Sequence, residues 1–161
     1  MARLHPAAPT SAARHAERLG VPWWWWLAAV AVTAGLAAEL WLGAIGARSW
    51  LPFAVLLPPV VGGMWWLGRI RVEVRDAELR VDDARLPTRF IADAVPLDAG
   101  GRRELLGPAA HPLAFVIQRP WIPGAVQVLL DDPADPTPYW VISSRRPAAL
   151  AAAILAARAH P

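Results

Sequence analysis

The chain has 161 residues, no Cys and a formal net charge of +3. This length accommodates two membrane spans and one small domain, and the lack of Cys excludes disulfides and thiolate metal sites. Every basic residue apart from His is Arg, and Arg and acidic residues are nearly balanced beyond residue 67. A nucleic-acid interface concentrates basic side chains on one face, so this distribution argues against a nucleic-acid partner.

Residues 1–22 are rich in Ala, Pro, Arg and His and show no sustained periodicity. This composition predicts a mobile cytosolic tail. The alternative is that residues 11–19 form one or two helical turns on the membrane surface.

Two apolar runs follow, at residues 23–42 and 50–67. Each is long enough to cross the hydrocarbon core of a bilayer, about 30 Å thick. Most Trp residues lie near the ends of these runs, where an indole ring has its apolar body in lipid and its N–H in the wet interface. These predicted interface anchors are Trp23, Trp24, Trp25, Trp26, Trp41, Trp50, Trp65 and Trp66. We therefore predict a transmembrane hairpin over residues 23–67.

The placement of Arg predicts the orientation of this hairpin. Three Arg precede the first run and three closely follow the second, whereas the connecting loop has only Arg48. The positive-inside rule therefore predicts a multi-pass protein of the cytoplasmic membrane with both termini in the cytoplasm. In an alternative interpretation the first run is a signal peptide cleaved near residues 44–47, although it is long and Trp-rich for that role.

Two features within the hairpin allow a structural and a functional interpretation. Glu39 is an ionisable residue in an apolar run, but it lies close enough to the outer interface to reach water or to pair with Arg48. Pro58 and Pro59 remove backbone donors and predict a kink, and the glycines at 62–63 allow close helix approach. We favour structural roles for both features.

Residues 68–161 are predicted to form a cytosolic, β-rich domain. Apolar and charged residues alternate from residue 70 to 75, the period-two pattern of a half-buried strand. Further strands are predicted at 78–81, 84–91, 91–97, 113–118, 125–130 and 139–143, with a helical turn at 100–106 and a C-terminal helix at 147–159. The fold class is thus a membrane α-helical hairpin plus a small α+β domain.

The order of these elements is similar to that of pleckstrin-homology-like domains, which predicts an open β-barrel plugged by the C-terminal helix. A simpler α+β sheet with one covering helix is the competing architecture.

The densest group of polar and aromatic residues in the domain is the candidate interaction surface. Its members are Arg119, Trp121, Asp131, Asp132, Asp135, Tyr139, Trp140, Arg145 and Arg146. In the functional interpretation, Arg145 and Arg146 near a helix N-terminus hold a phosphate or a lipid head group. In the structural interpretation, the Asp side chains cap backbone N–H groups of a Pro-stiffened turn and pair with Arg145.

No residue pattern predicts a catalytic site, a cofactor or a metal. Ser143 or Ser144 with His111 and an Asp could make a triad, but no nucleophile elbow surrounds either Ser. The aspartates lack the Gly and terminal Glu of a calcium loop. An enzyme is therefore the least favoured class.

Several segments resemble a known family of uncharacterised proteins. They are Leu40-Trp-Leu-Gly43, Arg119-Pro-Trp121, Gly124-Ala-Val126, Asp132-Pro-Ala-Asp-Pro-Thr-Pro-Tyr-Trp140 and Ser143-Ser-Arg-Arg-Pro147. They are similar to the actinobacterial two-span membrane proteins classed as domain of unknown function 3093. The resemblance implies a membrane protein with a C-terminal cytosolic domain, and it implies no activity, substrate or catalytic residue.

The sequence thus predicts a membrane-anchored interaction or scaffold module that binds a protein partner or a second copy of itself. The alternative is a module that binds lipid head groups at the inner membrane face through Arg69, Arg71, Arg145 and Arg146.

Overall fold

The structure, a computed structural model, describes residues 15–43, 50–108 and 110–159. The described chain forms two compact units, one of residues 18–70 and one that combines the N-terminal segment up to Glu17 with residues 71–161. The predicted combination of two long apolar helices with a small α+β domain is confirmed. The predicted pairing of Glu39 with Arg48 lies outside the described residues.

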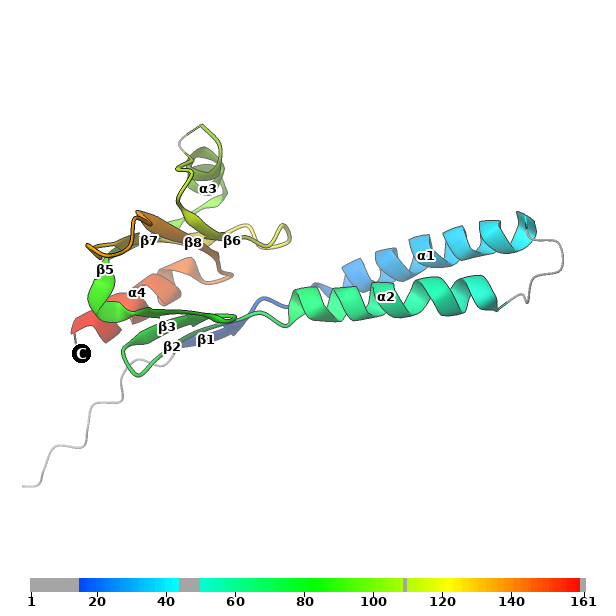
Figure 1. Ribbon diagram of the computed structural model, residues 1–161, viewed down its shortest axis with the longest axis horizontal. Helices are drawn as coiled ribbons and strands as arrows, with labels where there is room; N and C mark the ends of the chain where they lie inside the picture. Colours follow the sequence, from blue (N-terminus) through cyan, green and yellow to red (C-terminus); the bar gives the residue numbers. More distant parts are fainter. Residues whose placement is uncertain (1–14, 44–49, 109, 160–161) are drawn as a thin grey trace, which may run out of the picture. The chain divides into compact units, whose positions relative to one another are not determined.

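The first unit is a pair of helices, α1 (Trp23–Gly43) and α2 (Leu51–Gly68). Both are long and apolar enough to cross a membrane. They pack along each other (Figure 1), and Thr33 and Ala37, one turn apart, are the buried residues of α1. The Thr33 hydroxyl donates to the Ala29 carbonyl at 2.7 Å, so it needs no partner outside its own helix. Small side chains on this face allow the helix axes to approach closely.

Helix α2 runs without interruption through Pro58 and Pro59. A Cβ built on either Gly62 or Gly63 meets no atom within 4 Å. Neither glycine is therefore in close contact with α1, and close approach of another helix to them stays a prediction.

The α+β domain contains two four-stranded sheets. The first has the order β1-β2-β3-β4 and the second the order β5-β7-β8-β6. The strands of the first sheet are β1 (His15–Arg18), β2 (Arg71–Arg75), β3 (Glu78–Val81) and β4 (Ala84–Pro87). Those of the second are β5 (Ile91–Leu97), β6 (Phe115–Ile117), β7 (Ala125–Leu130) and β8 (Tyr139–Ser143). The strand pairings of the described chain form two open sheets rather than a closed barrel.

Strand β1 corrects the prediction of a tail for residues 15–18, whereas residues 1–14 lie outside the described residues. The four residues of β1 join the first sheet beside β2. Only one of them, Glu17, is buried. The hydrophobic pattern does not reveal this strand, because its buried residue is a carboxylate rather than an apolar side chain.

Tight turns connect β2 to β3 and β3 to β4 in the first sheet. Asp76 and Ala77, between β2 and β3, have φ values of 53° and 55°, and Asp82, between β3 and β4, has a φ of 55°. Two successive residues with positive φ match the type I′ hairpin turn that suits the twist of antiparallel strands.

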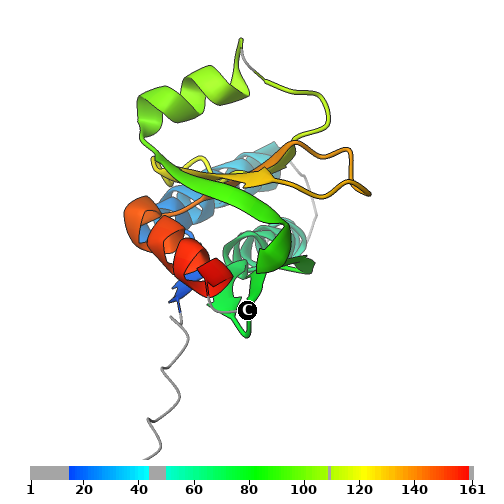
Figure 2. The same ribbon diagram turned by 90° about the vertical axis from the view of Figure 1, so that its left-hand side faces the viewer.

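The second sheet is mixed, and a helix lies on each of its faces. Strands β5, β7 and β8 are antiparallel neighbours, whereas β6 pairs in parallel with β8 and forms one edge. Helix α3 (Ala99–Leu106) covers one face, with Leu105 and Leu106 against Tyr139 and Val141. Helix α4 (Pro147–Ala159) lies on the other side of this sheet, and Figures 1 and 2 show it between the two sheets. All five residues of β8 are consequently buried.

Helix α4 is held along its length and at its C-terminal end. Its buried face consists of Leu150, Ala151, Ala153, Ile154 and Ala157. The hydroxyl of Thr88, in the 3-10 turn η1 (Thr88–Phe90), lies 3.0 Å from the Ala77 carbonyl and 3.4 Å from the Ala157 carbonyl, so its single proton is shared between the two acceptors. The Arg158 guanidinium donates to the Ala92 carbonyl. The helix therefore ties both sheets together as the central core element of the domain.

Candidate functional site

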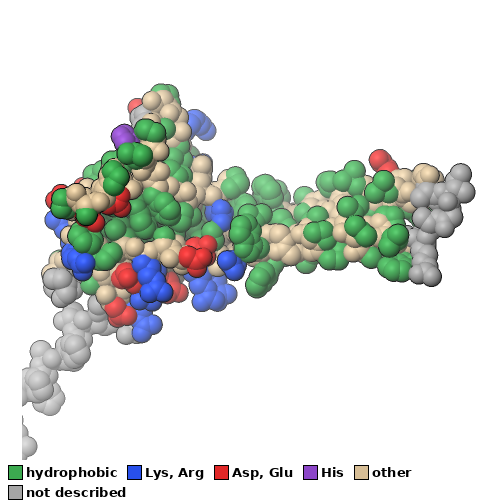
Figure 3. All heavy atoms as spheres, viewed as in Figure 1, with side chains coloured by type: hydrophobic (Ala, Val, Ile, Leu, Met, Phe, Trp, Pro, Cys, Tyr) green, Lys and Arg blue, Asp and Glu red, His purple; other side chains and the backbone are tan. Residues whose placement is uncertain are grey.

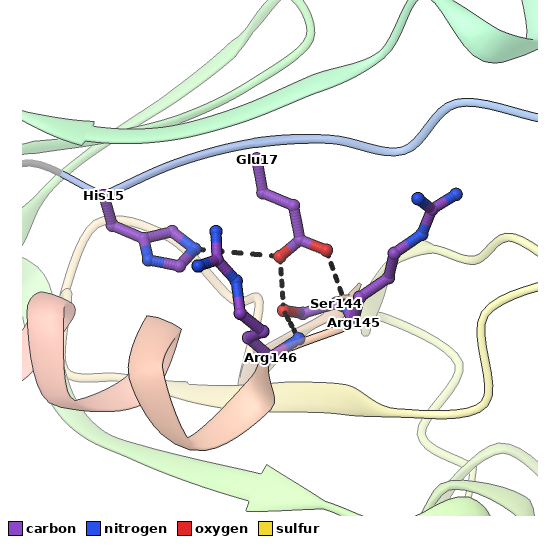
Figure 4. Close-up of polar contacts among 5 residues, drawn as sticks. All are labelled: His15, Glu17, Ser144, Arg145 and Arg146. Atoms are coloured by element: carbon purple, nitrogen blue, oxygen red, sulfur yellow. Dashed lines mark hydrogen bonds and ion pairs between the residues drawn. The ribbon is translucent and has the colours of Figure 1, made fainter.

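The most connected polar group of the domain surrounds a buried carboxylate. Glu17 of β1 is 8 % exposed. One carboxylate oxygen accepts a hydrogen bond from the Ser144 hydroxyl at 2.7 Å, and the other accepts one from the Arg145 backbone N–H at 2.6 Å (Figure 4). Burial of a carboxylate is costly unless such donors replace water. We call His15, Glu17, Ser144, Arg145 and Arg146 the Glu17 cluster.

Ser144 and His15 complete the surroundings of this carboxylate. Ser144 is fully buried, and its oxygen also accepts the Arg146 backbone N–H at 3.1 Å. The His15 Nε2 atom lies 3.7 Å from a Glu17 carboxylate oxygen, a distance that forms an ion pair when the imidazole is protonated. The Ser144 hydroxyl thus links the Arg146 N–H, just before α4, to the Glu17 carboxylate on β1.

The cluster lies where helix α4 begins. The Arg146 carbonyl accepts the Leu150 N–H at 3.0 Å, so Arg146 is the N-cap residue of α4. Pro147 occupies the first helical position. A negative charge near this end is favoured by the helix dipole. The chain supplies that charge itself through Glu17.

This arrangement changes the sequence-based interpretation of Arg145 and Arg146. The prediction that they hold a phosphate or a lipid head group combined their side-chain charge with free backbone N–H groups at the helix start. The N–H groups of both residues are already bonded, one to Glu17 and the other to Ser144. These backbone N–H groups are therefore not available to a phosphate.

The loop between β6 and β7 packs against the same segment. The Arg119 backbone N–H donates to the Ser143 hydroxyl at 2.9 Å, and its guanidinium lies 6.0 Å from the centre of the Trp121 ring. The Gly124 carbonyl accepts the Ser144 N–H at 3.1 Å. Arg119 and Trp121 are therefore brought close to the segment that carries Arg145 and Arg146.

Gly124 leaves no room for a side chain. A Cβ at this position would lie 2.8 Å from the Ser144 carbonyl oxygen and 3.1 Å from Cγ of Pro147. We expect Gly124→Ala to reduce the free energy of unfolding by about 1–3 kcal/mol, as for other overpacked sites. Urea denaturation followed by circular dichroism measures the loss. Gly100→Ala is the control, because its Cβ would approach no atom closer than 3.4 Å; equal effects of the two substitutions would contradict the steric explanation.

The aspartates form a separate turn at the other end of β8. The Asp131 N–H donates to the Phe90 carbonyl at 2.8 Å. The Asp132 carboxylate accepts the Ala134 N–H at 2.9 Å, and the Asp135 carboxylate accepts the Thr137 N–H at 2.8 Å. These contacts match the capping role of the structural interpretation. The five-residue strand β8 separates this turn from the Arg145 segment, a span of roughly 16 Å.

Hydrogen bonds from the Thr137 side chain and backbone lower the pKa of Asp135 below its ordinary value. The bonds favour the charged carboxylate, so they stabilise the turn above the ordinary aspartate pKa. This contribution is lost as the pH falls through the lowered pKa of the folded state. We expect Thr137→Val to raise the Asp135 pKa towards its ordinary value in an NMR titration. An unchanged titration midpoint would show that the Thr137 hydroxyl is not the cause.

The two remaining candidates, Tyr139 and Trp140, belong to the core. The Tyr139 hydroxyl accepts the His111 backbone N–H at 3.0 Å, and the Trp140 ring lies 4.4 Å from that of Phe115. Both side chains are buried. Their rings pack in the interior of the domain and are therefore not part of the exposed area of the candidate interaction surface.

The serines and the histidine considered for a triad have structural partners. Ser143 and Ser144 are buried and bonded as described above, and the His111 Nδ1 atom accepts the Leu113 N–H at 3.2 Å. Within the described ranges, no three His, Asp or Glu side chains gather closely enough to hold a metal ion.

Sequence reasoning missed the two residues of β1 that build the cluster, His15 and Glu17. The available signal was that Glu17 is the only acidic residue before Glu39. Its partner Ser144 is separated from it by 127 positions, so no local pattern could connect the two.

Comparison with known proteins identifies the family of the chain. No curated protein and no solved structure shows significant similarity to it. The model of one family, described as protein of unknown function (DUF3093), matches residues 14–154. The matched range includes both apolar helices, every strand of the two sheets and the Glu17 cluster. The chain therefore belongs to the DUF3093 family.

Proposed function

We propose that the chain is a membrane protein whose α1–α2 hairpin crosses the bilayer twice and anchors the α+β domain as an interaction module. The exposure of the helices carries this proposal. Only 11 % of the most apolar stretch of α1 and 6 % of that of α2 is buried. Figure 3 shows hydrophobic side chains along the visible face of both helices, whereas charged side chains gather on the domain.

Core helices of a soluble protein bury their apolar residues, and these helices do not. Large side chains such as Leu42, Val32 and Val55 are at least 60 % exposed. Exposed apolar surface costs about 25 cal/mol per Å² in water, and a lipid environment removes this cost. Six of the eight predicted Trp anchors are also exposed, as membrane-interface anchors would be. They are Trp23, Trp24, Trp41, Trp50, Trp65 and Trp66.

The Glu17 cluster argues against the alternative in which α1 is a cleaved signal peptide. Cleavage after α1 would remove β1 together with the helix. The Ser144 hydroxyl and the Arg145 N–H would then lose their acceptor in a buried site. Retention of β1 supports retention of α1 as a membrane span.

The membrane assignment is tested by alkaline carbonate extraction and by reporter fusions. We expect the full chain to stay in the pelleted membranes. A cytoplasm-active reporter should be active at either terminus, and a periplasm-active reporter should be active only in the loop between α1 and α2. Release by carbonate would overturn the proposal, and an active periplasmic reporter at a terminus would overturn the orientation.

The edge of the second sheet supports the interaction role. Strand β6 ends the strand order, and Val116 on it and Leu113 before it are 42 % and 53 % exposed. An apolar sheet edge is a template for pairing with another chain. Arg119 and Trp121, from the predicted interaction surface, follow directly in sequence. We propose that this edge, defined by residues 113–121, binds a protein partner or a second copy of the chain.

A photo-crosslinking residue at position 116 tests this edge. We expect crosslinks to one discrete partner, identified by mass spectrometry as another protein or as the chain itself. The same residue at the exposed position Glu104, on α3, is the control. Crosslinks that are equally diffuse at both positions would contradict a specific edge contact.

A lipid-binding role is the second candidate function, favoured by one contact of the hairpin. The Arg69 guanidinium lies 5.8 Å from the centre of the Trp66 ring, just beyond the end of α2. Trp and Arg side chains at this position meet the head-group region of a bilayer. The position of the C-terminal helix between two sheets supports the pleckstrin-homology-like interpretation of the domain. This interpretation is compatible with both the protein-binding and the lipid-binding role.

A further inference from the structure

A groove runs between α1 and α2 in the half of the hairpin that contains the start of α1 and the end of α2. Its volume is about 400 Å³. It is lined by Trp25, Ala28, Ala29, Val32, Thr33, Val60 and Met64. Ala28 and Ala29 contribute only methyl groups to this lining.

The chemistry of the lining selects an apolar occupant. The Thr33 hydroxyl, a polar group of the lining, is already bonded to the Ala29 carbonyl. The groove therefore offers hydrocarbon contacts and little hydrogen bonding. In a bilayer an unfilled groove forfeits dispersion contacts along its lining, so a flexible hydrocarbon chain is the occupant that the surroundings supply.

Basic side chains lie beyond the same end of the hairpin. The Leu19 N–H donates to the Ile70 carbonyl at 3.0 Å, so the segments that carry Arg18 and Arg69 run side by side. Both Arg residues are exposed. Arg69 follows the groove residue Met64 by five positions, about 7.5 Å at helical rise. The only acidic residue between Arg18 and Arg69 is Glu39, near the opposite end of α1.

We infer that this groove binds one acyl chain of an anionic phospholipid whose phosphate lies against Arg18 and Arg69. The inference rests on the proposed membrane insertion of the hairpin, and it names the lipid that the second candidate function leaves open. An apolar groove with two cations beyond its end matches the two parts of such a lipid, and a zwitterionic lipid lacks the net charge that the cations favour.

Native mass spectrometry of the full chain tests the site. The protein is reconstituted in nanodiscs of phosphatidylcholine and phosphatidylglycerol and then released into the gas phase. We expect a retained phosphatidylglycerol adduct on the wild-type chain. Ala28→Leu fills the groove from its exposed rim and should lower the adduct fraction about fivefold. The control Ala31→Leu adds the same volume to an exposed position of α1 outside the lining and should leave the adduct unchanged.

The head-group contact has a separate test in the same nanodiscs. The double variant Arg18→Gln and Arg69→Gln should retain lipid but lose the preference for phosphatidylglycerol over phosphatidylcholine. The circular dichroism spectrum of each variant shows whether the helices remain intact.

Five outcomes overturn the inference. Equal adducts in Ala28→Leu and Ala31→Leu would exclude the groove, and equal binding of the two lipids by the wild-type chain would exclude the charge contact. Loss of a dimer in Ala28→Leu alone would make a second copy the occupant. Release of the chain by carbonate would overturn the proposed function as well, whereas membrane retention without a selective adduct would overturn this inference alone.

Discussion

Glu17→Ala is expected to lower the free energy of unfolding of the α+β domain by about 2–4 kcal/mol. The substitution leaves the fully buried Ser144 hydroxyl and the Arg145 N–H without their acceptor. It also removes the attachment of β1 to the start of α4. Urea denaturation of the full chain in mild detergent measures the loss, and hydrogen exchange should show faster exchange of the Arg145 amide.

Two further variants separate this contact from a general effect of charge removal. Glu104→Ala removes an exposed carboxylate from α3 and should change stability by less than about 0.5 kcal/mol. Glu17→Gln keeps one acceptor oxygen and should lie between wild type and Glu17→Ala. If Glu17→Ala were as stable as Glu104→Ala, the cluster would have no part in holding the domain together.

Ile154→Ala is expected to cost about 2–5 kcal/mol because it opens a cavity at the centre of the domain. Ile154 is fully buried on α4, the helix that lies between the two sheets. A void there loosens contacts to both sheets, so we expect a lower midpoint of denaturation with one cooperative transition. The neighbouring Leu155 is 37 % exposed, and Leu155→Ala should cost less than about 1.5 kcal/mol. Similar losses for the two variants would mean that α4 is not packed between the sheets.

The strongly patterned elements of the domain lie where sequence reasoning places them. Strands β7 and β8 and helix α4 have the predicted bounds. Each is predominantly apolar and has a clear boundary signal, such as Gly124 before β7 and Pro147 at the start of α4. Local sequence signals are therefore sufficient to predict the bounds of these three elements.

Non-local contacts account for what sequence reasoning did not predict. The parallel pairing of β6 with β8 depends on register between segments that are not consecutive strands. The strand β1 has no apolar residue in the core, and Glu17 is buried only because Ser144 and Arg145 supply donors from the far end of the chain. The candidate interaction surface is divided into two parts, the aspartate turn and the Arg145 segment. Strand β8 joins these two parts in sequence, and all of its residues are buried.

The neighbouring positions of β1 and β2 have a consequence for the order of events during synthesis. The two strands are adjacent in one sheet, yet the whole helical hairpin lies between them in the chain. Strand β1 leaves the ribosome first, and its partner β2 follows only after both helices have been made. The hydrogen bonds that Glu17 accepts can form only after Ser144 and Arg145 have been synthesised, near the end of translation. We therefore expect the domain to complete its folding only after both helices have been synthesised, so completion of the first sheet depends on synthesis of the whole hairpin.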